Sequence, residues 1–190
     1  MNRLIAASAA TLLTAALAQP VLANAASNSA VTSIPVDPAT SIEMHVNADC
    51  AGTMCRFNTT ANLLTPDGPA GFPGDTWARQ TITLRSSDRE VWQEAYYSAP
   101  SGNPRDNKGE NHENVLSKLY KSLSDVEISV TMFGGGPIER FKIDGDSIPT
   151  DWRTGQPNTR ANFIACSQIQ VVYGGVNLTT PTACATTTFS

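Results

Sequence analysis

The stretch from residue 126 to residue 145 constrains the fold of this chain more than any other. It begins with an alternation of polar and apolar residues whose apolar members are Val126, Ile128, Val130 and Met132. That two-residue period is typical of a β-strand with one buried face. Residues 134–137 read Gly-Gly-Gly-Pro, and glycine-containing loops of this length connect the strands of ordinary hairpins. The stretch therefore predicts a central antiparallel hairpin in which Val130 faces Phe141.

The first two cysteines predict a second hairpin. The segments before Cys50 and after Cys55 both alternate, and each places its apolar side chains on one face. Pairing the two cysteines brings Ala48 opposite Phe57, and every inward residue then meets another inward residue. We therefore expect a Cys50–Cys55 disulfide that joins the two strands of this hairpin.

The remaining cysteines, Cys166 and Cys184, predict a second disulfide. A two-residue turn at Gly174-Gly175 would place Cys184 opposite Ala165, so one extra residue near Pro181 is needed to bring the cysteines into register. Two disulfides are typical of an exported chain. The rival interpretation is a four-cysteine zinc site, whose usual ligand spacings differ from those found here.

The beginning of the chain predicts export. Arg3 precedes an apolar segment over residues 4–18, and Ala23-Asn24-Ala25 fits a signal-peptide cleavage site. We expect cleavage after Ala25, a flexible tether over residues 26–40, and a single domain over residues 41–190. No later apolar stretch has the length of a membrane span, so we expect a secreted protein without one.

The charge balance argues against nucleic acid as a partner. The sequence holds 13 basic and 17 acidic residues, and its basic residues form no cluster. Such a chain is repelled by phosphate backbones and by anionic membrane surfaces.

Two short helices are predicted between the strands. Ser87-Asp88-Arg89-Glu90 matches a capping box before a helix over residues 88–97, and Trp92 falls on its apolar stripe. The valine and the two tyrosines of this segment would also suit a strand. The second helix, with Asn111 as N-cap, carries on one face Val115, Leu116, Leu119, Tyr120 and Leu123. With antiparallel hairpins of about six to seven strands, these helices predict an α+β domain stapled by disulfides.

Several short motifs together resemble a protein family. They are Gly71-Phe72-Pro73, Trp77-Ala78-Arg79-Gln80, Phe133-Gly134-Gly135-Gly136-Pro137, Asp151-Trp152-Arg153-Thr154-Gly155-Gln156-Pro157 and Val171-Val172-Tyr173-Gly174-Gly175-Val176-Asn177. Over most of residues 50–190 this combination resembles a group of small secreted proteins of mycobacteria and related actinobacteria. The resemblance implies export from an actinobacterial cell. It supplies no catalytic residue.

The sequence offers few groups for nucleophilic catalysis. Its two histidines are His45, on the polar side of a strand beside Glu43, and His112. No serine lies in a G-x-S-x-G motif, and paired cysteines leave no free thiol. We therefore lean away from an enzyme.

Three acidic residues form a candidate cation site. The predicted central hairpin places Glu127 opposite Asp144, close to Asp146, and two like charges at such a position repel. Three interpretations stay open: the strand ends fray, a neighbouring Arg or Lys compensates, or a hard cation such as Ca²⁺ binds the acids. No other cofactor is expected.

Trp152 is the strongest candidate for a binding residue. It lies between Asp151 and Arg153, close to Gln156, in a segment rich in glycine and proline. It either packs inward as an anchor of its loop or offers a flat face beside hydrogen-bonding groups, which suits a sugar or a peptide. The candidate surface also includes the turn at residues 134–137.

Two functions follow from these observations. The first is a non-enzymatic exported domain that binds an envelope glycan or an extracellular protein through the Trp152 surface. The alternative is a secreted hydrolase that acts on a polysaccharide or glycoconjugate with acids among Glu127, Asp144, Asp146 and Asp151, with Ca²⁺ as its cation.

Overall fold

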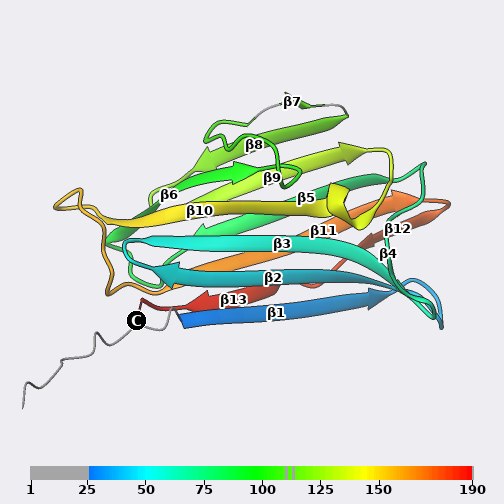
Figure 1. Ribbon diagram of the computed structural model, residues 1–190, viewed down its shortest axis with the longest axis horizontal. Coiled ribbons are helices and arrows are strands. Elements are labelled where there is room, and N and C mark those ends of the chain that lie inside the picture. Colours follow the sequence, from blue (N-terminus) through cyan, green and yellow to red (C-terminus); the bar gives the residue numbers. More distant parts are fainter. Residues whose placement is uncertain (1–25, 110, 113, 190) are drawn as a thin grey trace, which may run out of the picture.

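Two antiparallel β-sheets pack face to face in the computed structural model, and their inward side chains form one core (Figure 1). The structure describes residues 26–109, 111–112 and 114–189. Within these residues, helical structure is confined to one 3-10 turn, η1 (Ile138–Phe141). With 64% strand and 2% helical content, the fold is all-β, and the predicted α+β class with two helices is wrong.

The first sheet has the strand order β1-β2-β3-β10-β6, and the short strand β4 pairs with β3. Its strands are β1 (Ala26–Pro35), β2 (Ser41–Ala51), β3 (Met54–Thr65), β4 (Gly68–Ala70), β6 (Val91–Ser98) and β10 (Lys142–Asp151).

The second sheet has the order β12-β11-β5-β9-β8-β7, and β13 pairs with β11. Its strands are β5 (Trp77–Arg85), β7 (Asn111–His112), β8 (Val115–Lys121), β9 (Asp125–Phe133), β11 (Phe163–Tyr173), β12 (Val176–Thr179) and β13 (Ala183–Thr187).

Strand β2 shows how the sequence pattern builds this core. Ile42, Met44 and Val46 are fully buried, whereas Glu43 and His45 between them lie on the outer face. Burying one such apolar side chain contributes roughly 1.5–3 kcal/mol relative to leaving it exposed. A shift of one residue would exchange the two faces, so the alternation fixes the register.

The predicted helix over residues 88–97 is replaced by strand β6. Asp88 does not cap a helix; its Oδ1 accepts a hydrogen bond of 2.9 Å from the backbone N–H of Glu90 in a tight turn. Gln93 is buried among the inward residues, and its Oε1 accepts a hydrogen bond of 2.8 Å from the Ser147 hydroxyl. A glutamine at an inward position hides the strand period in the sequence. The apolar inward residues are Val91, Ala95 and Tyr97.

The predicted second helix is replaced by strand β8, and its expected N-cap, Asn111, lies in β7. Val115 is buried, whereas Leu116 and Tyr120 of the predicted apolar face are exposed. Apolar residues four positions apart, such as Val115 and Leu119, satisfy the helical and the strand period alike. Pairing with β9 along the whole of β8 decides in favour of the strand.

The central hairpin predicted over residues 126–145 does not form. β9 pairs with β5 and β8 in the second sheet, whereas β10 pairs with β3 and β6 in the first. Gly136 and Phe72 exchange backbone hydrogen bonds of 2.9 and 3.1 Å, and a Cβ atom at Gly135 would overlap the carbonyl oxygen of Pro73. The glycines therefore let the chain dock on residues 72–73 as it crosses between sheets.

The hairpin predicted around Cys50 and Cys55 is confirmed. β2 pairs with β3 in the expected register, with Cys50 opposite Cys55 and Ala48 opposite Phe57, and the two cysteines form a disulfide. Because both cysteines are fully buried, the disulfide forms part of the core.

The second disulfide, Cys166–Cys184, is confirmed as well. Tyr173 pairs with Val176 at the turn, yet Cys166 pairs with Cys184, so the register shifts by one residue between β12 and β13. The shift falls in the segment that contains Pro181, as predicted.

Residues 26–40 do not form the predicted tether. Strand β1 pairs with β2 from its first residue to its last. Asn28 Nδ2 donates to the carbonyl oxygen of Thr186 (2.8 Å), and Thr32 Oγ1 donates to that of Pro181 (2.7 Å). Small polar side chains thus join the edge of the first sheet to the second. The predicted signal peptide, residues 1–25, lies outside the described residues.

On the opposite edge, residues 99–109 form a strap between the two sheets. Tyr97 of β6 and Asp106 of the strap exchange two backbone hydrogen bonds of 2.9 Å, and the Leu119 N–H of β8 donates to the carbonyl oxygen of Lys108 (3.2 Å). The Asp106 carboxylate accepts from the backbone N–H groups of Asn107 and Gly109, both at 2.7 Å. Burial alone would raise the pKa of this carboxyl, but the backbone donors outweigh burial, and the pKa lies below its usual value.

The strap gives a pH-dependent prediction. Asp106→Asn should lower the free energy of unfolding at pH 7, because the Gly109 N–H loses a charged acceptor. A carboxyl with a lowered folded-state pKa stabilises the fold above its unfolded pKa, about 3.9, and this stabilisation is lost as the pH falls through the folded-state pKa. The difference between variant and parent should therefore shrink in acid. Urea titrations from neutral to acidic pH measure it, with Asp67→Asn in the exposed β3–β4 turn as control. A pH-independent difference would contradict it.

Candidate functional site

The loop that follows β10 is organised by the Asp151 carboxylate. Asp151 Oδ1 accepts hydrogen bonds from the backbone N–H groups of Arg153 and Thr154, both at 2.9 Å, and from the Thr154 hydroxyl at 3.1 Å. These donors, led by the Thr154 N–H, hold the pKa of the Asp151 carboxyl below its usual value. Asp151, predicted as a binding residue, therefore shapes the loop that presents Trp152.

Trp152 is packed on one side and open on the other. Its ring lies 5.7 Å from that of Trp92, at an interplanar angle of 37°. Its Nε1–H donates to the carbonyl oxygen of Leu123 (3.1 Å), and its backbone N–H donates to that of Glu90 (2.9 Å). The side chain nevertheless stays 49% exposed. An anchored indole whose polar hydrogen is already bonded offers its remaining face as an apolar platform.

The other predicted binding residues divide into two groups. The side chains of Arg153 and Gln156 are exposed in the same loop as Trp152. The turn at residues 134–137 lies at the opposite end of β9, because β9 begins beside Leu123 and ends at Phe133 (Figure 1). That turn is therefore not part of the Trp152 surface.

The predicted cation site is not assembled. Glu127 pairs with Thr83 and Tyr120 in the second sheet, whereas Asp144 and Asp146 lie on β10 in the first. Within the part of the chain that the structure describes, no group of three or more His, Cys, Asp or Glu side chains is placed to hold a metal ion. The expected proximity of Glu127 to Asp144 is therefore wrong, because the hairpin on which it depended does not exist.

A guanidinium group compensates the charges of Asp144 and Asp146. Arg105 of the strap donates to Asp146 Oδ2 through Nη1, and its Nη2 lies 3.1 Å from Asp144 Oδ2. The compensation predicted from the sequence concerned Glu127 and Asp144, whereas Arg105 pairs with Asp144 and Asp146. Because Arg105 is 40% exposed, the pairs hold the strap over β10 and contribute little on their own.

Trp92 and Tyr96 are surface residues that were not predicted from the sequence. Both point outward from β6, with Glu94 between them, because alternate residues of a strand share a face. The predicted helix places Trp92 on its apolar stripe, facing the protein core. In the structure Trp92 is half-buried and packs against Trp152. A strand period in this segment would have predicted both surface residues. It alternates inward Val91, Gln93 and Ala95 with outward Trp92, Glu94 and Tyr96.

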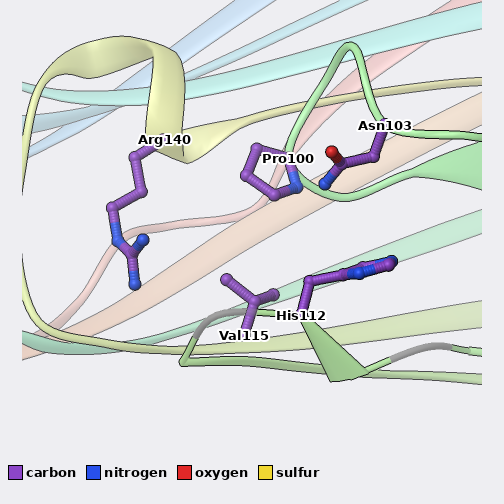
Figure 2. Close-up of a pocket in the computed structure, with 5 residues that line it drawn as sticks. All are labelled: Pro100, Asn103, His112, Val115 and Arg140. Atoms are coloured by element: carbon purple, nitrogen blue, oxygen red, sulfur yellow. The ribbon is translucent and has the colours of Figure 1, made fainter.

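A hollow of about 290 Å³ lies near η1, and Figure 2 shows the side chains around it. Its lining includes Pro100, Asn103, His112, Val115 and Arg140. The Arg140 guanidinium donates to the carbonyl oxygens of Gly134 (3.1 Å) and Phe133 (2.9 Å). Arg140 therefore holds the crossing between the sheets, and the hollow combines no nucleophile with a base among these residues.

The other histidine, His45, has an acidic partner. Its Nε2 lies 3.2 Å from Glu43 Oε2, which also accepts a hydrogen bond of 3.2 Å from the Asn62 amide. Thr60, the cross-strand neighbour of His45, directs its hydroxyl to Asn58 at 3.5 Å. This arrangement does not place a hydroxyl nucleophile on the imidazole.

Comparison with known proteins adds no family to this geometry: no protein-family model matches the chain, and a search of curated proteins finds no significant match. The two disulfides fit an oxidising, extracytoplasmic environment. Among the described residues, no helix is both long and apolar enough to cross a membrane.

Proposed function

We propose that this chain is an exported domain without catalytic activity of its own, which binds carbohydrate at or outside the cell envelope through Trp152. The observation that carries the proposal is the half-exposed indole of Trp152, which packs at a tilt against Trp92 and donates its Nε1–H to the carbonyl oxygen of Leu123. Sugar rings carry apolar C–H faces that stack on aromatic planes, and their hydroxyls bind polar side chains at the rim.

The surroundings of Trp152 support a sugar as the ligand. Arg153 and Gln156 expose hydrogen-bonding side chains in the same loop. Because Asp151 already fixes the loop, binding would order few additional groups, which limits its entropic cost.

Substituting Trp152 tests the proposal. Trp152→Ala should weaken binding to soluble glucan, mannan, xylan or arabinogalactan by about tenfold or more, because the stacking face is removed. Affinity electrophoresis and calorimetry with the purified, oxidised protein measure the change. Trp152→Phe should keep part of the affinity.

Phe133→Ala is the matched control, since the Phe133 ring is similarly exposed (45%) at the far end of β9. It should bind as the parent does. If the parent binds none of the four polysaccharides, or if Trp152→Ala binds as well as Phe133→Ala, the proposed function is wrong.

A further inference from the structure

We infer that the ligand is a neutral polysaccharide in an extended conformation, which runs along β6 from Trp152 to Tyr96. The inference rests on the proposed function, because it takes Trp152 as the first stacking position. It adds a second position at which a sugar ring stacks, the direction in which the polysaccharide runs, and the charge class of that polysaccharide.

The order of side chains on β6 gives the direction. Trp92, Glu94 and Tyr96 occupy the outer face of the strand, and Trp152 continues the row beyond Trp92. Tyr96 is 36% exposed, so its ring is also open to solvent. Trp92 and Tyr96 are separated by about 13 Å along the strand, since a strand rises roughly 3.3 Å per residue. A monosaccharide cannot contact both ends of this row, whereas an extended chain of several sugar rings can.

The charges beside the row select against an anionic chain. Glu94 lies between the aromatic residues, and Tyr96 is the cross-strand neighbour of Asp146. Asp144 adds a third carboxylate, and two guanidinium groups lie on the same face, those of Arg105 and of Arg56, the β3 neighbour of Asp146. These five groups give this part of the surface a formal charge of −1. Uronic acid or phosphate groups would be repelled there, whereas neutral hydroxyls can donate to the carboxylates.

The Tyr96 end also offers directed hydrogen bonds. Arg105 is 40% exposed, and it pairs with Asp146 through one nitrogen and with Asp144 through another. A guanidinium and a carboxylate side by side supply donors and acceptors for neighbouring hydroxyls of one sugar. Tyr96 and this ion pair therefore form a second sugar-binding position, in which an aromatic ring lies beside hydrogen-bonding side chains, as Trp152 does in its loop.

A length series tests the inference. Calorimetry is performed with cello-, malto-, xylo- and manno-oligosaccharides, from disaccharide to hexasaccharide, on the parent, Tyr96→Ala and Trp152→Ala. Parent affinity should rise with length in the series that binds, and Tyr96→Ala should remove that rise, about fivefold or more, without changing disaccharide affinity. Trp152→Ala should weaken every length.

Tyr120→Ala is the matched control, because Tyr120 is exposed (51%) on the outer face of the other sheet. Tyr96→Phe keeps the ring and should retain the length dependence, which separates loss of stacking from loss of folding. If the parent affinity does not rise with length, or if Tyr96→Ala behaves like Tyr120→Ala, the inference is overturned, while an effect of Trp152→Ala would still support the proposed function.

The charge class is tested with the polymer of the series that binds and its carboxymethylated derivative, which has the same backbone with added negative charge. The derivative should bind more weakly than the neutral polymer at low salt. Equal or tighter binding of the derivative would overturn the neutral class.

Discussion

Replacing Gly135 with alanine is expected to lower the free energy of unfolding by roughly 3 kcal/mol, at the upper end of the usual cost of overpacking. A Cβ atom at this position would overlap the backbone carbonyl oxygens of Phe72 and Pro73. Backbone atoms cannot rotate away as a side chain can, so the crossing between the sheets would have to separate from residues 72–73. Urea denaturation followed by tryptophan fluorescence measures the loss.

Gly74→Ala provides the control for this prediction. A Cβ atom at Gly74 would have no heavy atom within 4 Å, although this glycine lies in the segment that contacts the crossing. Its substitution should change the free energy of unfolding by no more than about 0.5 kcal/mol. Equal stability of the Gly135 and Gly74 variants would show that the crossing is not packed as described.

Removing the Cys166–Cys184 disulfide is expected to cost about 3 kcal/mol, because its loop spans 18 residues and the cross-link restricts the unfolded chain. Cys184 is exposed but Cys166 is buried, so serine, which has nearly the volume of cysteine, is used at both positions. The double variant Cys166→Ser, Cys184→Ser leaves little cavity behind. The loss should therefore reflect the cross-link itself. The midpoint of urea denaturation measures this loss of stability. The intact mass of the variant verifies that the remaining disulfide is formed.

Thr186→Ala, an exposed change on the same strand, should leave the urea midpoint nearly unchanged. A double cysteine variant as stable as this control would contradict a stabilising role for the second disulfide. The Cys50–Cys55 disulfide closes a loop with a sequence separation of 5. Its chain-entropy contribution should be smaller, about 2 kcal/mol.

The alternation of apolar and polar residues was sufficient to predict strand register where the two paired strands were close in sequence. The β2–β3 register followed from matching inward residues across the loop between Cys50 and Cys55, and the structure has it unchanged. The one-residue shift near Pro181 followed from the same counting. In both cases the short connection left few alternative pairings, so alternation fixed the register.

The same reasoning gave a wrong hairpin at residues 126–145, because a locally consistent register is not evidence of pairing. β9 and β10 each find partners far away in sequence, and the glycines between them are needed for contact with Phe72 and Pro73. Nothing in the stretch itself distinguishes a turn glycine from one that lets two backbones approach closely. Strand pairing likewise turned both predicted helices into strands: β6 pairs with the distant β10, and β8 pairs with β9, the next strand in the chain.

The candidate site was half visible in the sequence. Trp152 could be selected because a tryptophan among polar residues, glycine and proline suits a surface loop. Trp92 and Tyr96 could not, because the helical interpretation placed Trp92 in the core. Arg105 joins Asp144 and Asp146 only through the fold, from a strap whose sequence has few apolar residues.

The contact between β1 and β13 has a consequence for when this protein can fold. Strand β1 hydrogen-bonds through Asn28 and Thr32 to Thr186 and Pro181, which the ribosome adds 158 and 149 residues later. That edge cannot close until β13 has been made, so the long-range topology delays completion of the sandwich. Until then β1 can pair only with β2, which directly follows it in the chain.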